Sequence, residues 1–364
     1  QQHGLALVNS FFGAMLHGAI PAIMPFLTRK LSPEKYQADI RALMGITQPA
    51  AILTETAFME LMAGLSGAGS SARAVVDVSG CQEIQALPDL DGFGGTQRSP
   101  DDIVLLQHSS GTTGLQKGVA LSNRAVLRQL DTYSETLHLT EKDVIVSWLP
   151  LYHDMGLIAG FILPLAQGVR LVLMSPFDWV VAPHRLLQAV SQYRGTLSWL
   201  PNFAYNFCAQ KIRERDIAGV DLSSWRAVSN CSEPMRWESH QMFFERFKSQ
   251  GLRNEALTTC YAMAENVFAV SQGGIEEPVK TLAVDALALV SQRRLLPPEA
   301  GKPVQTLLSA GKPLPNTQVR ILDDRHRRLR EDEIGEIALK SDCMLAGYYH
   351  RPDATRQSFH RGWL

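Results

Sequence analysis

Hydroxyl side chains, glycines and a single lysine crowd into residues 109–118, which read SSGTTGLQKG. Glycines let a backbone approach a phosphate closely and direct several N–H groups at it, and hydroxyls add further donors. Lys117 adds a positive charge on a long, flexible side chain. The segment therefore indicates a site for a nucleotide triphosphate, although its spacing differs from the P-loop pattern Gly-x-x-x-x-Gly-Lys-Ser/Thr. A flexible surface loop has a similar composition, and that alternative stays open.

A histidine occupies a second segment of interest, residues 148–156 (WLPLYHDMG), which join an expected strand to an expected helix. Ligands of open α/β sheets bind at the carboxyl ends of the strands. His153 therefore lies where it could meet a substrate carboxylate. In the alternative interpretation, Asp154 caps the helix and His153 is only its neighbour.

Two later segments combine polar and aromatic side chains. Residues 230–234 (NCSEP) follow an expected strand, so Ser232 and Glu233 could contact a base or a ribose; a plain strand-to-helix turn is the alternative. Residues 258–265 (TTCYAMAE) place Tyr261, whose ring could stack on a purine, four residues before Glu265. A single carboxylate beside phosphates suits Mg²⁺, which keeps water and substrate oxygens as most of its ligands. A helix start with an exposed glutamate explains this last segment equally well.

These segments need a scaffold of alternating strands and helices. The patterns predict helices over residues 11–16, 33–44, 123–137, 155–165, 183–193, 204–215 and 238–248. They predict strands over residues 19–24, 50–53, 103–106, 144–148, 170–174, 195–199 and 225–228, and surface connections over residues 66–99. Such alternation is typical of α/β proteins, so we expect two doubly wound, largely parallel sheets packed with helices. Two more strands, 319–322 and 336–340, flank a charged turn and predict a small antiparallel β subdomain.

Composition limits the classes of partner. The 364 residues carry a formal net charge of -1, so no global charge attracts the chain to nucleic acid or acidic lipid. The basic cluster Arg325–Arg328 lies in the charged turn without interleaved aromatic residues, which favours a solvated face over nucleic-acid binding. We expect no nucleic-acid partner.

The cysteines and the first apolar stretch bear on location. Five scattered cysteines (Cys81, Cys208, Cys231, Cys260, Cys343) have no metal-ligand spacing and fit free thiols in a reducing cytoplasm. Polar residues and two prolines interrupt residues 5–27. This stretch therefore predicts a buried helix and a strand, and we expect no transmembrane segment or signal peptide.

Taken together and in this order, the motifs resemble those of the adenylate-forming superfamily of acyl-CoA synthetases, fatty acyl-AMP ligases, luciferases and peptide-synthetase adenylation domains. The resemblance covers essentially the whole chain. It rests on the segments already described and on Gly335–Ile337, Gly347–Tyr348 and Arg351–Pro352. Residues 147–158 and 201–205 (PNFAY) are most similar to the fatty acyl-AMP ligase branch. That branch passes the acyl group to the phosphopantetheine of an acyl carrier protein.

The resemblance implies an acid-activating ligase that converts a fatty acid and ATP into acyl-AMP and pyrophosphate. It implies that catalysis depends on Lys117, His153 and Glu265, with Mg²⁺ on Glu265 and the substrate carboxylate near His153. It assigns nucleotide binding to Ser109, Ser110, Gly111, Thr112, Thr113, Gly114, Lys117, Ser232, Glu233, Tyr261, Ala262, Met263 and Ala264. An apolar acyl tunnel would run beside the helix at Met155. An acyl-CoA synthetase and a non-catalytic adenylate-binding module of a larger synthase are the alternatives.

The resemblance also implies domain boundaries and departures. We expect a first α/β subdomain with the phosphate loop at 1–141, a second with the nucleotide and acyl site at 142–304, and a truncated β subdomain at 305–364. Gln116 replaces a usual proline, and Ala262 and Ser341 replace usual glycines. The family's Thr-Gly-Asp motif and its C-terminal domain with a catalytic lysine should lie past Leu364. We therefore expect this chain to bind nucleotide yet adenylate poorly.

Overall fold

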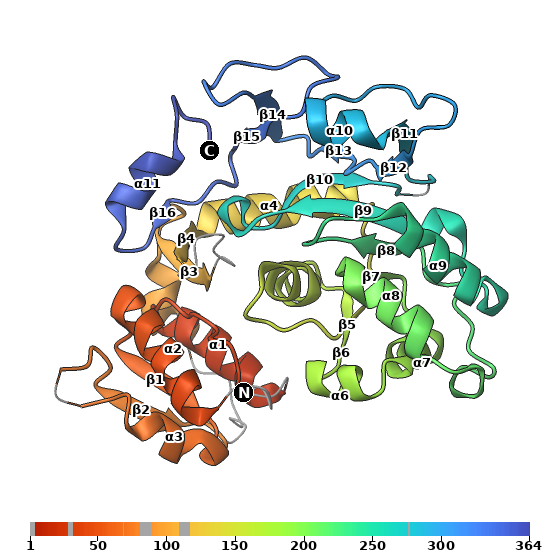
Figure 1. Cartoon of the computed structure of the whole chain (residues 1–364). Coiled ribbons are helices and arrows are strands. Elements are labelled where there is room, and N and C mark those ends of the chain that lie inside the picture. The colour runs from red at the N-terminus through yellow and green to blue at the C-terminus, as the bar shows by residue number, and fades with distance from the viewer. Residues whose placement is uncertain (1–3, 28–31, 68, 81–88, 109–116, 276) are drawn as a thin grey trace. The chain divides into compact units, whose positions relative to one another are not determined.

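The computed structural model describes residues 4–27, 32–67, 69–80, 89–108, 117–275 and 277–364. Its backbone divides into two compact units (Figure 1). Unit 1 comprises Gln1–Val126 and Leu345–Gln357, and unit 2 comprises Leu127–Met344 and Ser358–Leu364. The boundaries that the sequence suggests at residues 141 and 304 stay a prediction.

Unit 1 holds two small sheets and several helices. The strands β1 (Ala51–Thr54) and β2 (Ala74–Asp77) pair in parallel, whereas β3 (Ile103–His108), β4 (Gly118–Ser122) and β16 (Gly347–Tyr348) form an antiparallel sheet. The helices are α1 (Leu5–His17), α2 (Pro33–Thr47), α3 (Met59–Ala63) and α11 (Pro352–Ser358), with 3-10 turns η1 (Thr56–Phe58), η2 (Leu90–Gly92) and η3 (Gly94–Gln97). Because β3 ends at His108 and β4 begins at Gly118, these two strands flank the segment that carries the phosphate-loop motif.

The strand predicted over residues 19–24 is wrong. The structure has only a single parallel bridge there, between Ala22 and Leu106. Pro21 and Pro25 have no N–H group, so the segment cannot supply the donors of a continuous ladder. Helix α2, by contrast, was predicted and is confirmed. Ser32 caps it by accepting a 3.2 Å hydrogen bond from Lys35 N.

The core of unit 1 follows from the spacing of apolar residues in α2. Tyr36, Ile40, Leu43 and Met44 recur at helical spacing and are buried. They form one cluster with Met62, Leu65 and Ala72, which come from α3 and from the segment that follows it. This packing explains why an amphipathic pattern in the sequence located the helix correctly.

Unit 2 is built on a seven-stranded sheet in the order β13-β10-β9-β8-β7-β5-β6. The strands are β5 (Val144–Ser147), β6 (Arg170–Leu173), β7 (Leu197–Leu200), β8 (Ala227–Asn230), β9 (Leu257–Ala262), β10 (Ala269–Gly273) and β13 (Lys312–Pro313). Pairing is parallel from β6 to β9 and antiparallel at β10 and β13. Every residue of β5, β7 and β8 is buried, as expected for parallel strands that are covered on both faces.

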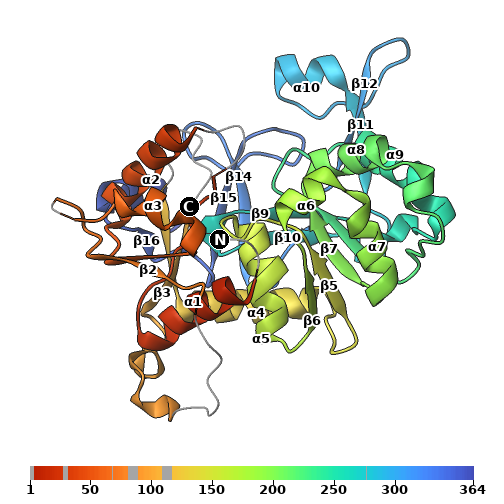
Figure 2. The same cartoon turned by 90° about the horizontal axis from the view of Figure 1, so that it is seen from below.

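Helices cover both faces of this sheet (Figure 2). They are α4 (Asn123–Thr136), the π-helix η4 (Met155–Ile162), α5 (Leu163–Ala166), α6 (Pro176–Val181), α7 (His184–Tyr193), α8 (Asn202–Lys211) and α9 (Trp237–Phe247). On one face, the Trp199 indole N–H donates to the Tyr133 hydroxyl of α4 at 2.8 Å. On the other face, the Tyr205 hydroxyl of α8 donates to Val228 O at 2.8 Å. The predicted α/β class with a parallel-rich sheet is confirmed, while the described strands of unit 1 form no second large parallel sheet.

Two further antiparallel pairs complete unit 2. Strands β11 (Thr281–Asp285) and β12 (Val304–Leu308) pair and flank α10 (Ala286–Gln292). Strands β14 (Thr317–Leu322) and β15 (Glu336–Ser341) confirm the predicted antiparallel β unit.

Cys208, Cys231, Cys260 and Cys343 are buried free thiols, as predicted, and Cys81 lies outside the described residues. Across the described ranges, no helix has both the length and the apolar content to cross a membrane.

Candidate functional site

The carboxyl ends of β5, β8 and β9 lie at one edge of the large sheet, because these strands run parallel to one another. The loops after them carry most of the predicted site residues of unit 2: His153 after β5, Ser232 and Glu233 after β8, and Glu265 after β9. Parallel α/β sheets bind ligands at this edge. The structure therefore brings together residues that are far apart in the sequence.

Two glycines bring η4 close to β5 and to the turn that follows this strand. A Cβ on Gly156 would lie 2.3 Å from Pro150 O, and a Cβ on Gly160 would lie 2.6 Å from Ser147 Oγ. Neither position has room for a side chain without movement of its neighbours. The close approach fixes the turn that holds Tyr152, His153 and Asp154, and Asp154 accepts a 2.8 Å hydrogen bond from Met155 N at the start of η4. The capping role considered for Asp154 is thus observed.

The electrostatics couple the loop after β5 to the loop after β9. Burial, with a smaller contribution from the negative charge of Glu265, raises the pKa of Asp154 to about 6. Burial also raises the pKa of Tyr261, again with a contribution from Glu265. Glu265 therefore lies within electrostatic range of both groups.

His153 lies beside another aromatic side chain in the same loop. Its ring centroid is 4.6 Å from that of Tyr152, with the ring planes inclined by 43°. The surrounding protein lowers the pKa of His153, because desolvation disfavours the imidazolium form. The imidazole is consequently neutral at pH 7 and has one nitrogen that can donate and one that can accept a hydrogen bond.

The segment 258–265 is not a helix start, so that alternative is wrong. Strand β9 extends to Ala262, and a 3-10 turn, η8 (Ala264–Asn266), follows. Tyr261, Ala262, Met263 and Glu265 are half-buried, whereas Ala264 is buried. The predicted adenine-binding residues thus lie along the end of a strand and the turn after it.

An unusual backbone conformation follows Glu265 directly. Val267 has φ 63° and ψ −55°, close to the values of a strained γ-turn, and Phe268 N donates to Asn266 O at 2.6 Å. Positive φ is unfavourable for a β-branched residue. Met263 N donates to Phe268 O at 2.9 Å and closes the connection from β9 to β10. Strain of this kind persists only where the surroundings enforce it, and it often lies at functional sites.

The loop after β8 is attached to the start of α8. Glu233 Oε2 accepts a 3.0 Å hydrogen bond from Phe203 N, so this carboxylate contacts the helix N-terminus. Asn202 Oδ1 accepts hydrogen bonds from Asn230 Nδ2 and Arg236 N, both at 3.0 Å. The sequence singled out Asn202 only as part of the PNFAY resemblance and did not place it at the site.

The donor set fits a hydrated Mg²⁺ better than a metal ion held by protein alone. Among the described residues, no group of three or more His, Cys, Asp or Glu side chains could hold a metal ion. Glu265 supplies carboxylate oxygens, and Asp154 adds a second carboxyl group within electrostatic range. Mg²⁺ takes one or two carboxylates and fills its remaining positions with water and substrate phosphate oxygens.

In unit 1, the residues Ser109, Ser110, Gly111, Thr112, Thr113 and Gly114 lie outside the described part of the chain. Lys117 is described: it precedes β4, is half-buried, and holds its Nζ 4.5 Å from the centroid of the Tyr348 ring in β16. Both residues belong to unit 1. That Lys117 and Glu265 act on one ligand stays a prediction.

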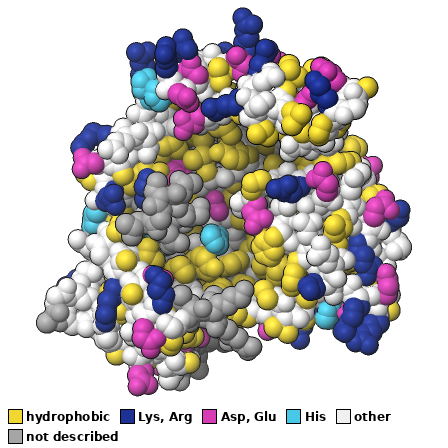
Figure 3. Space-filling view, viewed as in Figure 1, with side chains coloured by type: hydrophobic (Ala, Val, Ile, Leu, Met, Phe, Trp, Pro, Cys, Tyr) yellow, Lys and Arg dark blue, Asp and Glu magenta, His cyan; other side chains and the backbone are white. Residues whose placement is uncertain are grey.

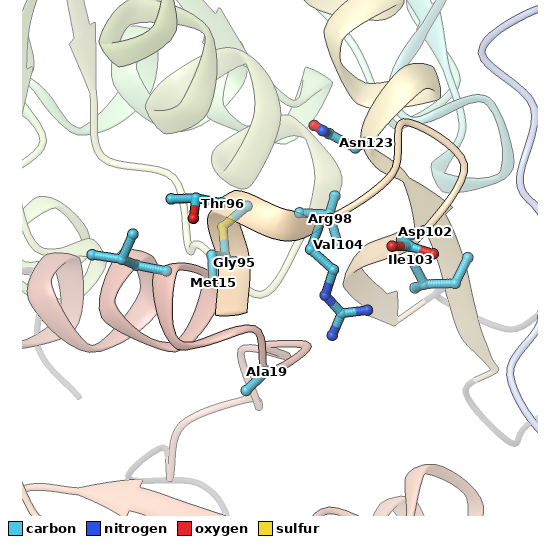
Figure 4. A pocket seen from close by; sticks show the side chains of 10 residues that line it. Met15, Ala19, Gly95, Thr96, Arg98, Asp102, Ile103, Val104 and Asn123 are labelled. Carbon is cyan, nitrogen blue, oxygen red and sulfur yellow. The ribbon is translucent and has the colours of Figure 1, made fainter. Parts of the chain in front are cut away.

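A separate cavity of about 270 Å³ lies in unit 1 (Figure 4). Its lining includes Met15 from α1, Arg98, and Asp102 and Ile103 at the start of β3. None of the predicted site residues that the structure describes lines this cavity. On the face shown in Figure 3, Lys and Arg side chains are dispersed among acidic ones, without a single large basic patch.

Comparison with known proteins gives consistent matches. Residues 2–349 match the family described as AMP-binding enzyme. The chain is 31% identical to the medium-chain-fatty-acid–[acyl-carrier-protein] ligase JamA of Moorena producens (strain JHB), over 98% of this chain and 60% of that protein. It is 32% identical to the putative fatty-acid–CoA ligase FadD21 of Mycobacterium tuberculosis (strain H37Rv), over 98% of this chain and 61% of that protein. The chain thus spans well under two thirds of these relatives' length.

Among solved structures, a fatty acyl-adenylate ligase from L. pneumophila, in complex with acyl adenylate and pyrophosphate, superposes with a TM-score of 0.87 at 29% identity. The match covers 99% of this chain and 62% of that one. A structure from work on fatty acyl-adenylate ligases of E. coli and L. pneumophila gives a TM-score of 0.89 at 27% identity and covers 100% of this chain and 65% of that one. The fold agrees with that of adenylating enzymes.

Proposed function

Because the chain belongs to the AMP-binding enzyme family, we propose that it activates a fatty acid to acyl-adenylate, with ATP as the second substrate and pyrophosphate as the product. The single observation that supports this most is the parallel arrangement of β5, β8 and β9. That arrangement gathers His153, Ser232 and Glu265 at the ligand-binding edge of one sheet. The relatives named as fatty-acid ligases support the choice of a fatty acid.

In the proposed reaction, a carboxylate oxygen of the fatty acid attacks the α-phosphorus of ATP. A P–O bond forms at that atom, and the bond to the pyrophosphate oxygen breaks. Both reactants are anionic, so the site must offset their repulsion. No side chain acts as a covalent nucleophile; the protein contributes positioning and charge stabilisation.

The residues have separate roles in this scheme. Lys117, with Ser109, Ser110, Thr112 and Thr113, holds the β- and γ-phosphates. Glu265 holds Mg²⁺, which neutralises phosphate charge when it is bound. Tyr261 stacks on the adenine, beside Ala262, Met263 and Ala264, and Ser232 faces the base or the ribose. His153, as a neutral imidazole, hydrogen-bonds and orients the fatty-acid carboxylate.

Glu233 has an observed contact that refines its proposed role. Its Oε2 atom is already engaged by Phe203 N. The carboxylate therefore fixes the loop that carries Ser232, and its other oxygen remains for a ribose hydroxyl. This division suits a site in which binding groups must be held in place before the ligand arrives.

We propose an acyl carrier protein as the acceptor of the acyl group, in line with the name of the relative from Moorena producens. An acyl-CoA synthetase is the second candidate, because the relative from Mycobacterium tuberculosis is named as a putative fatty-acid–CoA ligase. A non-catalytic adenylate-binding module is the third candidate, and the presence of both Lys117 and Glu265 disfavours it.

Mass spectrometry of products from the full-length protein tests this proposal. The protein is incubated with Mg·ATP and fatty acids of graded chain length, then with CoA or with a phosphopantetheinylated carrier protein. We expect acyl-AMP first, and an acyl-carrier thioester rather than acyl-CoA second. Lys117→Ala serves as the matched control and should abolish most of the acyl-AMP. Absence of acyl-AMP from folded wild-type protein with every acid would contradict the proposed activity.

A further inference from the structure

One buried side chain, Asn202, joins three segments at the edge of the sheet. It is the first residue of α8, directly after Pro201, and only 6% of it is exposed. Its Oδ1 atom accepts two hydrogen bonds of 3.0 Å, from Asn230 Nδ2 and from Arg236 N. Its Nδ2 atom donates to Ser239 Oγ at 3.1 Å, so both ends of the amide are used.

The two donors to Asn202 flank the loop that carries Ser232 and Glu233. Asn230 is the last residue of β8, and Arg236 directly precedes α9. A single oxygen atom therefore closes the loop 231–235 at both ends. Because Ser239 lies in the first turn of α9, the same amide also fixes that helix relative to α8.

The loop in turn stabilises the helix from which Asn202 projects. The first N–H groups of a helix have no partner within it, and Pro201 before α8 supplies no side-chain cap. Glu233 fills this role by accepting from Phe203 N. Helix and loop thus hold each other: the Asn202 amide fixes the loop ends, and the carboxylate from the middle of the loop caps the helix.

The conformation of the loop requires such support. Ser232 has φ 68°, in the left-handed region that residues other than glycine rarely adopt. It is exposed, and its hydroxyl lies 3.7 Å from Met155 Sδ. A strained, exposed residue keeps one conformation only when neighbouring contacts enforce it. Asn202 contacts the residues at both ends of this loop, and Cys231 N also donates to Leu200 O at 3.1 Å.

We propose that Asn202 is a positioning residue that holds the loop 231–235 ready for the nucleotide, an inference that rests on the proposed function of that loop. In this role, Asn202 acts through Ser232 and Glu233 rather than by contacting the substrate. The expected consequence of its loss is weaker nucleotide binding, with little effect on the chemical step once the nucleotide is bound. The effect should therefore fall mainly on KM for ATP rather than on kcat.

Amide hydrogen exchange without any ligand tests the structural half of the proposal. Asn202→Ala removes the acceptor of the Arg236 N–H, so exchange in residues 231–236 should rise at least roughly tenfold, while exchange in β7 stays unchanged. Asn202→Asp keeps the acceptor at a helix N-terminus, where a carboxylate is favourable, and should restore most of the protection. Lys211→Ala, an exposed change at the other end of α8, is the matched control and should leave residues 231–236 unaffected.

Calorimetric titration with ATP and AMP tests the functional half. Asn202→Ala should lower the affinity for both nucleotides roughly tenfold, which is the loss expected for one neutral hydrogen bond. Asn202→Asp should recover most of that affinity. If Asn202→Ala lost the Arg236 protection but bound nucleotide like the wild type, the positioning role would be overturned. If wild-type protein bound no nucleotide, the proposed function would fail, while the exchange result would still decide whether Asn202 closes the loop. Should Asn202→Ala not fold, Asn202→Ser, whose shorter side chain also loses the Arg236 contact, replaces it in both measurements, with Asn202→Asp again as the variant that restores the acceptor.

Discussion

The ammonium group of Lys117 lies over the ring of Tyr348, 4.5 Å from the ring centroid. The pairing of β16 with β4 causes this contact, because it places Tyr348 opposite Val119 in the antiparallel register. The face of an aromatic ring attracts a cation without neutralising it. The contact therefore orients the Lys117 side chain, as a phosphate site requires.

The first prediction concerns this pair. Lys117→Ala should weaken binding of Mg·ATP by roughly 10- to 100-fold, since a hydrogen bond to a charged group contributes about 1.5–3 kcal/mol. Tyr348→Phe keeps the ring face and should leave the affinity nearly unchanged, whereas Tyr348→Leu should weaken it several-fold. Isothermal titration calorimetry measures all three variants. Wild-type affinity in Lys117→Ala would remove this residue from the phosphate site.

A second prediction follows from the pKa of Asp154, which burial and the charge of Glu265 raise to about 6. The pKa of this carboxyl group is about 6 in the folded state and near 4 in the unfolded state. The group therefore contributes its full stability below pH 4, where it is protonated in both states, and this contribution is lost as the pH rises through 6. Asp154→Asn keeps an acceptor for Met155 N but cannot ionise. Between pH 4 and pH 7, the free energy of unfolding of this variant should therefore rise relative to that of the wild type by roughly 1–3 kcal/mol. Melting temperatures measured at each pH report this difference.

Glu265→Gln provides the control for this pH dependence. Removal of the neighbouring charge should lower the pKa of Asp154, so the loss of stability should occur at a lower pH than in the wild type. An identical pH dependence in wild type and Asp154→Asn would show that the Asp154 carboxyl is not the group that titrates.

A third prediction contrasts two glycines in helices. Gly156→Ala places a Cβ 2.3 Å from Pro150 O and should lower stability by roughly 1–3 kcal/mol through overpacking. Gly45→Ala, inside α2, meets no atom within 4 Å and should raise stability by up to roughly 1 kcal/mol, because alanine is the better helix former. Thermal unfolding of both variants checks that stability falls in Gly156→Ala and rises in Gly45→Ala. A stabilised Gly156→Ala variant would contradict the close packing of η4 on the turn before it.

A fourth prediction concerns the ion pair of Asp143 and Arg226, which is largely buried. Arg226 donates to both carboxylate oxygens, at 2.8 and 3.0 Å, and also to Leu137 O at 2.9 Å. Burial alone would raise the pKa of Asp143, but the hydrogen bonds from Arg226 and Thr196 outweigh it, and the pKa is lowered. Asp143→Asn should thus cost roughly 3–5 kcal/mol at pH 7, because it leaves a partly buried guanidinium without its partner.

The difference between wild type and Asp143→Asn should shrink as the pH falls below about 4, since protonation removes the same charge in the wild type. Lys35→Ala, which breaks the exposed pair with Asp39, is the matched control and should change the melting temperature little. A similar small effect for Asp143→Asn would show that the Asp143–Arg226 pair does not stabilise unit 2.

The sequence located the central strands approximately, because β5, β7 and β8 each contain apolar residues that are buried in a sheet covered on both faces. It missed two-residue strands such as β13 and β16, which exist only through pairing with distant partners. The same limit applies to the site. His153 could be proposed from its place after an expected strand and Glu265 from its spacing to Tyr261, whereas the role of Asn202 depends on Asn230, Arg236 and Ser239, which only the folded chain brings to it.

We propose that Lys117 and Glu265 act on the same Mg·ATP. A double-mutant cycle tests it most directly: calorimetric affinities for Mg·ATP are measured for wild type, Lys117→Ala, Glu265→Ala and the double variant. We predict that each single change weakens binding and that the two losses are not additive, with a coupling of at least roughly 0.5 kcal/mol, since both residues would contact one ligand. Strictly additive losses, or wild-type affinity in either single variant, would contradict a shared site.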